Sequence, residues 1–210
     1  MRNPSDCQLY GILDLGYVTA SDAERVTKAM IDGGVDLIQL RAKSRPLAEI
    51  INLAATLQQV TAGAGVSLVV NDYAEVAAEV PLEGVHVGQD DDAIDHARKK
   101  AGRPVLVGKS THSLEQAIAA EREGADYIGF GPNFATPTKP DYKPIGLTGI
   151  KRVQHEVTVP MFCIGGIKIE NLGQVIAAGA TRVTIVSGLL KAPDIAKYAR
   201  ACKNLLSPES

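Results

Sequence analysis

Short runs of aliphatic and β-branched residues alternate along the whole chain with longer stretches whose apolar residues recur at helical spacing. Such runs are typical of parallel strands buried on both faces, and the stretches between them are typical of crossover helices. The runs predict strands over residues 8–13, 36–41, 66–71, 84–87, 104–109, 125–130, 160–164 and 181–187. Strand and helix therefore alternate from one end of the chain to the other.

Helix-capping residues support this phasing. Ser21 precedes a predicted helix over residues 22–32, and Glu24 three residues later completes a capping-box pattern. Ser113 precedes a second predicted helix over residues 114–123 in the same way. Two further helices are predicted over residues 170–178 and 193–206.

Glycine marks four joints at which a helical pattern changes to a strand pattern, at Gly34, Gly84, Gly124 and Gly179. Glycine just past a helix supplies a left-handed C-cap without a Cβ penalty. The repeated joint indicates one recurrent βα unit, and eight such units favour a closed (β/α)8 TIM barrel. An open doubly wound sheet is the alternative, but no GxGxxG fingerprint follows the first strand. We therefore predict an α/β fold, a (β/α)8 barrel, as a single domain over residues 1–210.

The charge and aromatic content argue against nucleic acid as a partner. The 210 residues carry 22 Lys and Arg against 24 Asp and Glu, a net charge of -2, whereas nucleic-acid binding usually needs a basic face. The chain has no Trp, six Tyr and three Phe, which is poor material for stacking bases.

Cellular location is predicted from three further features. The N-terminal segment is polar and carries Asp6, so it lacks the apolar core of a signal peptide. No apolar run approaches the ~18 residues of a membrane span, which argues against a membrane partner. Cys7, Cys163 and Cys202 are widely spaced and form no CxxC pair, which favours a reducing compartment over a disulfide framework or a zinc site. We expect a cytoplasmic protein.

The second predicted strand ends in QLRAK, which places Gln39, Arg41 and Lys43 on one side of the chain because strand side chains alternate. In a barrel, functional groups collect at the C-terminal ends of the strands. Two cations and an amide there form a natural receptor for a diphosphate. The alternative is that Arg41 and Lys43 lie in a solvated loop.

Acidic residues follow the third and fourth strands. Asp72 comes directly after the third, and Asp90, Asp91 and Asp92 follow the fourth. Mg²⁺ is usually held by one or two carboxylates together with substrate phosphates and waters, so these acids could share one ion. Alternatively, Asp72 caps a helix and the Asp run complements a helix dipole. His86, inside the fourth strand, is expected to be a hydrogen-bonded core histidine.

The later strand ends offer hydroxyls, glycines and one more cation. No GxSxG elbow surrounds Ser110, which argues against a hydrolase triad, and no role is assigned to His112. The long loop after the sixth strand carries Thr136, Thr138 and Lys139, which suit phosphate oxygens unless the loop is an inert surface segment.

Gly166 follows the seventh strand and Ser187 ends the eighth, where barrel enzymes often bind phosphate through backbone N–H groups, although each could be a plain turn. The predicted mouth therefore has two anion sites of different character. The first is cationic and metal-assisted: Arg41, Lys43, Lys139, Asp72 and Asp91. The second combines backbone and hydroxyls: Gly166, Ser187, Thr136 and Thr138. Such a mouth suits two phosphorylated ligands, or one ligand with a phosphate at each end.

Seven motifs occur in a specific order: QLRAK, VVND, GVHVGQDD, GKSTH, GADYIGFGPNFATPTK, IGGI and IVSGLL. In order and spacing the chain resembles the thiamine phosphate synthase family over residues 9–190. The resemblance implies a (β/α)8 transferase that joins 4-amino-5-hydroxymethyl-2-methylpyrimidine diphosphate to 4-methyl-5-(2-hydroxyethyl)thiazole phosphate, or to its carboxylated form, and releases pyrophosphate. It also implies that the pyrimidine–diphosphate bond breaks first, and that the protein is a homodimer.

The resemblance assigns residues to each part of the site. It implies that Asp72 and Asp91 hold Mg²⁺ as the cofactor. The pyrimidine diphosphate site would comprise Gln39, Leu40, Arg41, Ala42, Lys43, Asn71, Ser110 and Lys139. The thiazole phosphate site would comprise Thr136, Pro137, Thr138, Gly166, Val186 and Ser187. Among these residues, catalysis would rest on Arg41, Lys43, Ser110 and Lys139, which neutralise or bind the leaving pyrophosphate.

Two departures and three rival interpretations remain. The first strand reads LYGILD where the family often has LYLVTD, and Lys109 stands where an aliphatic residue is expected. Lys109 would be a fourth cation if it points into the mouth and a surface residue if it points outward. The rivals are a thiazole tautomerase-like barrel, a phosphosugar isomerase or epimerase, and a non-catalytic phosphate-ligand sensor.

Overall fold

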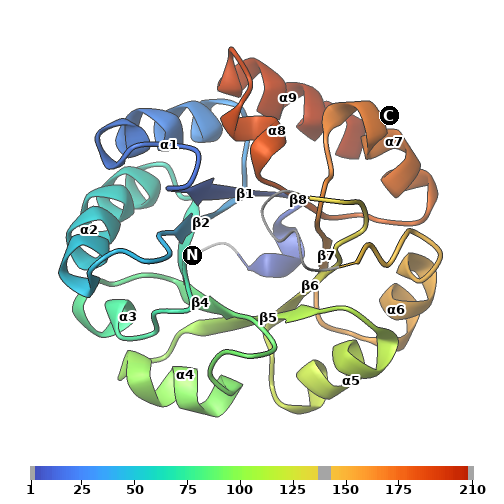
Figure 1. Cartoon of the computed structure of the whole chain (residues 1–210), viewed down its shortest axis with the longest axis horizontal. Helices are drawn as coiled ribbons and strands as arrows, with labels where there is room; N and C mark the ends of the chain where they lie inside the picture. The colour runs from blue at the N-terminus through green and yellow to red at the C-terminus, as the bar shows by residue number, and fades with distance from the viewer. Residues whose placement is uncertain (1–2, 137–142, 208–210) are drawn as a thin grey trace.

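Parallel strands form a closed ring around a central axis, and helices cover the outside of the ring (Figure 1). The structure, a computed structural model, describes residues 3–136 and 143–207. Within these residues the strands are β1 (Leu9–Asp14), β2 (Leu37–Arg41), β3 (Ser67–Asn71), β4 (Gly84–Val87), β5 (Leu106–Thr111), β6 (Tyr127–Phe130), β7 (Met161–Cys163) and β8 (Val183–Ile185). Each strand pairs in parallel with its neighbours in chain order, and β8 closes the ring on β1. The predicted (β/α)8 barrel is confirmed.

Helices α1 to α7 connect successive strands, and α8 and α9 follow β8. In the described part of the chain they are α1 (Ala23–Asp32), α2 (Leu47–Gly63), α3 (Val76–Glu79), α4 (Ile94–Ala101), α5 (Leu114–Arg122), α6 (Ile150–Glu156), α7 (Ile169–Ala177), α8 (Ser187–Leu190) and α9 (Ile195–Leu206). Two 3-10 helices, η1 (Pro4–Asp6) and η2 (Ala20–Asp22), precede β1 and α1.

The local predictions have mixed outcomes. Ser113 caps α5 by accepting a hydrogen bond from the backbone of Gln116, as predicted. The capping box at Ser21 is wrong, because Ser21 lies within η2 and Asp22 takes the N-cap position. Gly34, Gly124 and Gly179 adopt the positive φ expected past a helix, whereas Gly84 is the first residue of β4 and does not.

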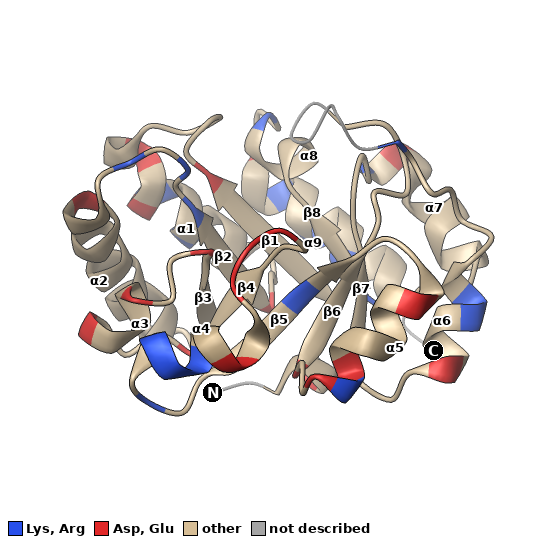
Figure 2. Cartoon of the chain, turned by 60° about the horizontal axis from the view of Figure 1, so that its bottom comes forward, with Lys and Arg blue, Asp and Glu red and all other residues tan. Residues whose placement is uncertain are grey.

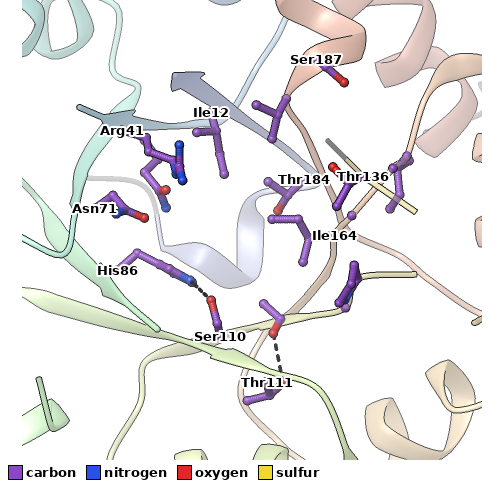
Figure 3. Close-up of a pocket in the computed structure, with 18 of the residues that line it drawn as sticks. Ile12, Arg41, Asn71, His86, Ser110, Thr111, Thr136, Ile164, Thr184 and Ser187 are labelled. Atoms are coloured by element: carbon purple, nitrogen blue, oxygen red, sulfur yellow. Dashed lines mark hydrogen bonds between the residues drawn. The ribbon is translucent and has the colours of Figure 1, made fainter. Parts of the chain in front are cut away.

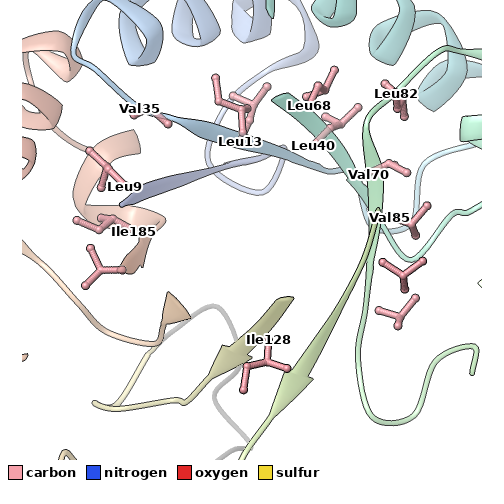
Figure 4. Close-up of a cluster of buried hydrophobic side chains, with 14 of the residues drawn as sticks. Leu9, Leu13, Val35, Leu40, Leu68, Val70, Leu82, Val85, Ile128 and Ile185 are labelled. Carbon is pink, nitrogen blue, oxygen red and sulfur yellow. The ribbon is translucent and has the colours of Figure 1, made fainter. Parts of the chain in front are cut away.

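Side-chain alternation gives the barrel two cores. Leu9, Leu13, Leu40 and Val85 point outward and pack beneath the helices, in the cluster drawn in Figure 4. The inward residues form a separate inner core: Cys7, Tyr10, Ile12, Leu37, Val69, Tyr127 and Phe162. This inner core fills the lower barrel, so the inward residues near the C-terminal strand ends are left to line a cavity above it.

The N-terminal segment closes the lower end of the barrel. Cys7 directly follows η1, is buried in the inner core, and lies with its thiol 3.8 Å from the backbone oxygen of Asp36 at the start of β2. The Asp36 carboxylate accepts hydrogen bonds from the backbone N–H groups of Gln8 and Leu9 and pairs with Lys203 of α9. These bonds tie the start of the chain to β2 and to the last helix, so the other end of the barrel carries the open cavity.

The three cysteines should not react with thiol reagents in the folded protein. All three are buried and none forms a disulfide, and burial raises the pKa of Cys163 and of Cys202 to about 12. Burial disfavours the thiolate, so these groups stay protonated at pH 8 and are also inaccessible. We expect no labelling by a disulfide reagent at pH 8 until guanidinium unfolds the chain, when three equivalents should react. Labelling of any cysteine before the unfolding transition would contradict this packing.

Charges of both signs are spread over the helices seen in Figure 2, as the small net charge suggests. Among the helices of the described residues, none combines the length and the apolar character that crossing a membrane requires.

Candidate active site

One cavity opens at the C-terminal ends of the strands; we call it the central cavity (Figure 3). Most strands contribute inward residues to its wall, because the parallel register brings residues of neighbouring strands side by side, as Ile12 pairs with Gln39. The lining includes Ile12, Gln39, Arg41, Asn71, His86, Ser110, Thr136, Ile164, Gly165, Gly166, Thr184, Val186 and Ser187. The lining combines apolar side chains such as Ile12, Ile164 and Val186 with polar groups, which suits an organic ring bearing phosphate.

Arg41 reaches this cavity while paired to a buried acid. Its Nη1 atom lies 2.7 Å from Oδ2 of Asp14, which stands opposite it in the β1–β2 register. The Asp14 side chain is only 4% exposed, and its other oxygen accepts a hydrogen bond from the backbone N–H of Gly16 at 2.9 Å. One edge of the guanidinium is therefore fixed by Asp14, so the group is held in place at the cavity wall.

A second, more open cavity adjoins the first at the ends of β3 and β4; we call it the acidic cavity. Its lining is Lys43, Ser44, Asp72, Tyr73, Glu75, Asp90, Asp91, Asp92 and Lys100. Asn71 lines the central cavity and the next residue, Asp72, lines the acidic one, so the two cavities meet at this strand end.

Two carboxylates face each other in the acidic cavity. The pKa of Asp72 is raised, first by burial and then by the like charge of Asp91 and a hydrogen bond with it. Lys43, whose Nζ lies 3.3 Å from Oδ2 of Asp72, only partly opposes this shift. Oδ2 of Asp91 accepts a hydrogen bond from the backbone N–H of Gly88 at 2.7 Å. A close carboxylate pair of this kind is unfavourable by itself and favours binding of a cation.

The other acids of the Asp run have different partners. Asp92 accepts from Lys100 at 2.8 Å and lies 2.9 Å from His96, and its pKa is lowered mainly by the Lys100 hydrogen bond. Asp72 does not cap a helix: α3 begins at Val76 with Glu75 in the N-cap position. Asp72 instead adopts a positive φ of 65°, which turns its carboxylate toward Asp91. The capping interpretation of Asp72 is therefore wrong.

The donor set of the acidic cavity fits Mg²⁺. The ion prefers carboxylate oxygens and keeps several positions for water and substrate phosphate, so two acids suffice. Asp72 and Asp91 supply such oxygens side by side, at a place where their mutual repulsion would be relieved by a cation. Across residues 3–136 and 143–207 no group of three or more His, Cys, Asp or Glu side chains is placed to hold a metal.

The loop after β6 is attached to the loop after β7 at the opposite side of the cavity. The backbone N–H groups of Asn133 and Phe134 donate to the carbonyls of Ile164 and Gly165 at 2.8 and 2.9 Å. Gly166 has φ +65°, and a Cβ there would lie 2.6 Å from the carbonyl oxygen of Ala135. This close approach requires glycine, and it leaves the backbone of Gly166 at the cavity wall.

The structure brings most of the predicted site residues together. Central-cavity residues are Gln39, Arg41, Asn71, Ser110, Thr136, Gly166, Val186 and Ser187. The acidic cavity collects Lys43, Asp72 and Asp91. Leu40 and Ala42 differ, because they alternate with the inward residues and their side chains lie in the outer core. Pro137, Thr138 and Lys139 lie outside the described residues.

Sequence analysis missed Asp14 and did not foresee where His86 and Lys109 would lie. Asp14 lies at the end of β1, beside Arg41 at the end of β2. The sequence pattern that could have indicated Asp14 is an acidic residue at one predicted strand end and a basic residue at the next. His86 is hydrogen-bonded, as predicted, but it also lines the central cavity. Lys109 is buried on the outer face of β5, so it is neither a cavity cation nor a surface residue.

The fold and the site are those of the (β/α)8-barrel class, with charged and glycine-rich groups gathered at the C-terminal strand ends. Comparison with known proteins makes the class specific. Residues 9–189 match the family described as thiamine monophosphate synthase. The thiamine-phosphate synthase of Chloroflexus aurantiacus is 41% identical over 203 residues, which is 96% of this chain and 94% of that protein. That of Halalkalibacterium halodurans is 41% identical over 191 residues, 90% of each chain.

A solved structure agrees with these sequence matches. The thiamine phosphate pyrophosphorylase from Pyrococcus furiosus superposes with a TM-score of 0.88 at 30% identity, covering 98% of this chain and 97% of that one. The chain belongs to the thiamine monophosphate synthase family, and it is a transferase.

Proposed function

We propose that this protein is a Mg²⁺-dependent thiamine phosphate synthase. It would join 4-amino-5-hydroxymethyl-2-methylpyrimidine diphosphate to 4-methyl-5-(2-hydroxyethyl)thiazole phosphate, or to the carboxylated thiazole, and release pyrophosphate. The observation that carries the proposal is the meeting of the two cavities at the end of β3. Arg41 lines the central cavity, and Lys43 lies with the carboxylate pair of Asp72 and Asp91 in the acidic cavity beside it.

The proposed reaction needs charge neutralisation more than a nucleophilic side chain. The bond between the pyrimidine methylene carbon and the diphosphate oxygen breaks, and its electron pair leaves with pyrophosphate. The thiazole nitrogen then forms the new C–N bond to the resulting cation. Arg41 and Lys43 would stabilise the charge that develops on the leaving group, together with Lys139. Gln39 and Asn71 would orient the pyrimidine diphosphate so that the reactive carbon faces the thiazole.

Asp72 and Asp91 would hold the Mg²⁺ ion beside Lys43. When bound, the ion supplies positive charge to the oxygens of the diphosphate and makes pyrophosphate a better leaving group. The chain holds the two carboxylates adjacent, and a bound cation would offset the burial and the like charge that raise the pKa of Asp72. The Gly88 N–H holds Asp91, and Lys43 favours the charged form of Asp72.

The thiazole phosphate would bind on the β7–β8 side of the central cavity. Gly166, Val186 and Ser187 line that side, with Thr136 from the loop after β6. Glycine lets a backbone N–H approach a phosphate oxygen closely, and hydroxyls complete the contacts. Pro137 and Thr138 are included in this proposed site on the family resemblance alone.

Replacing Gly166 by Ala should weaken binding of the thiazole phosphate. The new Cβ would meet the Ala135 carbonyl oxygen at 2.6 Å, and alanine is strained at φ +65°, so the loop must shift. We expect the KM for the thiazole phosphate to rise about tenfold or more, with a smaller change for the diphosphate, because about 1–2 kcal/mol of strain acts on one site only. The measurement is steady-state kinetics with each substrate varied in turn.

Gly173→Ala is the matched control. Gly173 lies in α7, has open space around its Cα, and is exposed. Alanine in a helix interior should leave both KM values unchanged and raise stability by about 0.5–1 kcal/mol. Equal KM values for Gly166→Ala and wild type would contradict the placement of the thiazole phosphate at Gly166.

The proposed function is tested by incubating purified protein with both substrates and Mg²⁺ and identifying the products by chromatography and mass spectrometry. Thiamine phosphate and pyrophosphate should form together, and omission of either substrate should abolish both. A folded protein that binds the thiazole phosphate but forms no product would instead favour a tautomerase-like enzyme or a ligand sensor.

A further inference from the structure

A continuous chain of hydrogen bonds crosses the barrel interior beneath the central cavity. Gln39 Nε2 donates to the Tyr10 hydroxyl at 2.5 Å, and that hydroxyl lies 3.2 Å from the Tyr127 hydroxyl. The Tyr127 hydroxyl lies 3.3 Å from Nδ1 of His86, and Nε2 of His86 lies 2.9 Å from the Ser110 hydroxyl. Gln39 and Ser110, the two ends of the chain, line the cavity, and both tyrosines are buried.

The direction of this chain is set at Gln39. An amide nitrogen donates and does not accept, so Tyr10 must accept from Gln39 and has its own proton free for Tyr127. Tyr127 can then donate to Nδ1 of His86. A neutral imidazole that accepts at Nδ1 carries its proton on Nε2, which donates to the Ser110 oxygen. The Ser110 proton is therefore left to point into the cavity.

We propose that Tyr10, Tyr127 and His86 are positioning residues that hold Ser110 as a hydrogen-bond donor to the ligand in the central cavity. The identity of that ligand rests on the proposed function, in which the acceptor is an oxygen of the leaving diphosphate. A donor aimed in advance at developing negative charge stabilises the transition state without reorganisation.

The surrounding packing is built to keep these groups in register. A Cβ at position 108 would lie 2.1 Å from Cζ of Tyr127 and 2.6 Å from Nδ1 of His86, so Gly108 makes room for their contact. The Tyr10 and Tyr127 rings both pack edge-on to Phe162, with centroids 5.4 and 5.8 Å apart from it. The rings therefore cannot swing away from the hydrogen-bonded positions without disturbing the inner core.

Burial also keeps both tyrosines protonated. It raises the pKa of Tyr10 and the pKa of Tyr127 well above the usual value of 10 for tyrosine. Each hydroxyl can therefore act as acceptor from one neighbour and donor to the next at any pH at which the enzyme would work.

The first test is the tautomer of His86 in the wild-type protein without substrates. Long-range ¹H–¹⁵N NMR separates a protonated from an unprotonated ring nitrogen, and the four histidines can be assigned by substitution. We expect the Nε2–H tautomer at His86. If the Gln39 amide is oriented the other way, every bond in the chain reverses, and an Nδ1–H tautomer in the wild type would overturn the proposal.

The second test is Tyr127→Phe, which removes one hydroxyl and keeps the ring. Without the Tyr127 proton, Nδ1 of His86 loses its donor, so the NMR spectrum should show a mixture of tautomers. The kcat for thiamine phosphate formation should fall about tenfold, because Ser110 would no longer be oriented to donate its hydrogen bond in the transition state. The KM for the diphosphate should change little. Adding Tyr10→Phe to this variant should cost little more, because the chain is already broken.

Thr27→Val is the matched control for loss of a buried hydroxyl. Thr27 lies in α1, and its hydroxyl has no hydrogen-bond partner among the described residues, so both the His86 tautomer and kcat should be unchanged. A single unaltered tautomer and a wild-type kcat in Tyr127→Phe would overturn the proposal. If the Nε2–H tautomer is found but the wild type forms no thiamine phosphate, the hydrogen-bond chain stands and the proposed function fails.

Discussion

Asp72→Asn should lower turnover at saturating substrates by about 100-fold or more without lowering stability. The substitution removes one of the two proposed Mg²⁺ ligands, and metal-assisted neutralisation of a leaving group contributes several kcal/mol to a transition state. Asparagine adopts positive φ readily, so the backbone at φ 65° is retained. Burial and the like charge of Asp91 raise the pKa of Asp72, which means that the folded state disfavours its carboxylate near pH 7. Removing that charge should therefore leave the Tm equal or higher.

The measurements are kcat over a range of Mg²⁺ concentrations and Tm with and without Mg²⁺. Added Mg²⁺ should raise the Tm of the wild type and not that of the variant, because only the former binds the ion. Asp92→Asn is the control: this neighbouring acid pairs with Lys100 and His96, so its loss should leave kcat nearly unchanged. Comparable Mg²⁺-dependent turnover in Asp72→Asn and wild type would contradict the metal assignment.

Arg41→Met should lower kcat/KM for the pyrimidine diphosphate by about 100-fold or more, because it removes a positive charge that lines the central cavity at the proposed diphosphate site. The same change leaves Asp14 buried without its partner at 2.7 Å, and an uncompensated buried charge costs about 3–5 kcal/mol. Kinetics of the single variant alone would therefore mix lost binding with lost folding.

The double variant Asp14→Asn/Arg41→Met separates these effects. It removes both charges, so unfolding by urea should show stability closer to the wild type than that of Arg41→Met, while kcat/KM stays low. Asp14→Asn alone should give an intermediate loss of kcat/KM, because the guanidinium remains but is no longer fixed by a buried acid. Recovery of kcat/KM in the double variant would show that Arg41 acts through stability and not through the diphosphate.

The strand order could be predicted because each buried parallel strand is a distinct apolar run, and because glycines mark many of the joints. The register of a strand is set by its pairing with neighbouring strands, and no local sequence pattern encodes that pairing. The observed strand bounds therefore differ from the predicted ones. β5 was predicted over residues 104–109 and lies at Leu106–Thr111. The capping box at Ser21 failed for a related reason: the extra 3-10 turn before α1 uses that segment.

The rim of the site could be predicted for the same reason as the fold, because polar residues at the ends of parallel strands meet at one face. Leu40 and Ala42 show the limit of that argument, since residues adjacent to Arg41 in the sequence point into the opposite core. The floor of the site could not be predicted. Tyr10, Tyr127 and His86 lie in three different strands, and only closure of the barrel brings their polar atoms within hydrogen-bond distance.

The central claim is that this barrel joins two phosphorylated substrates with metal-assisted loss of pyrophosphate. A ³¹P NMR time course with both substrates and Mg²⁺ tests it most directly, followed by addition of a chelator partway through. Pyrophosphate and thiamine phosphate should accumulate in a one-to-one ratio and stop when the metal is removed. Accumulation that continues unchanged after chelation, or the absence of both products from a folded protein, would contradict the claim.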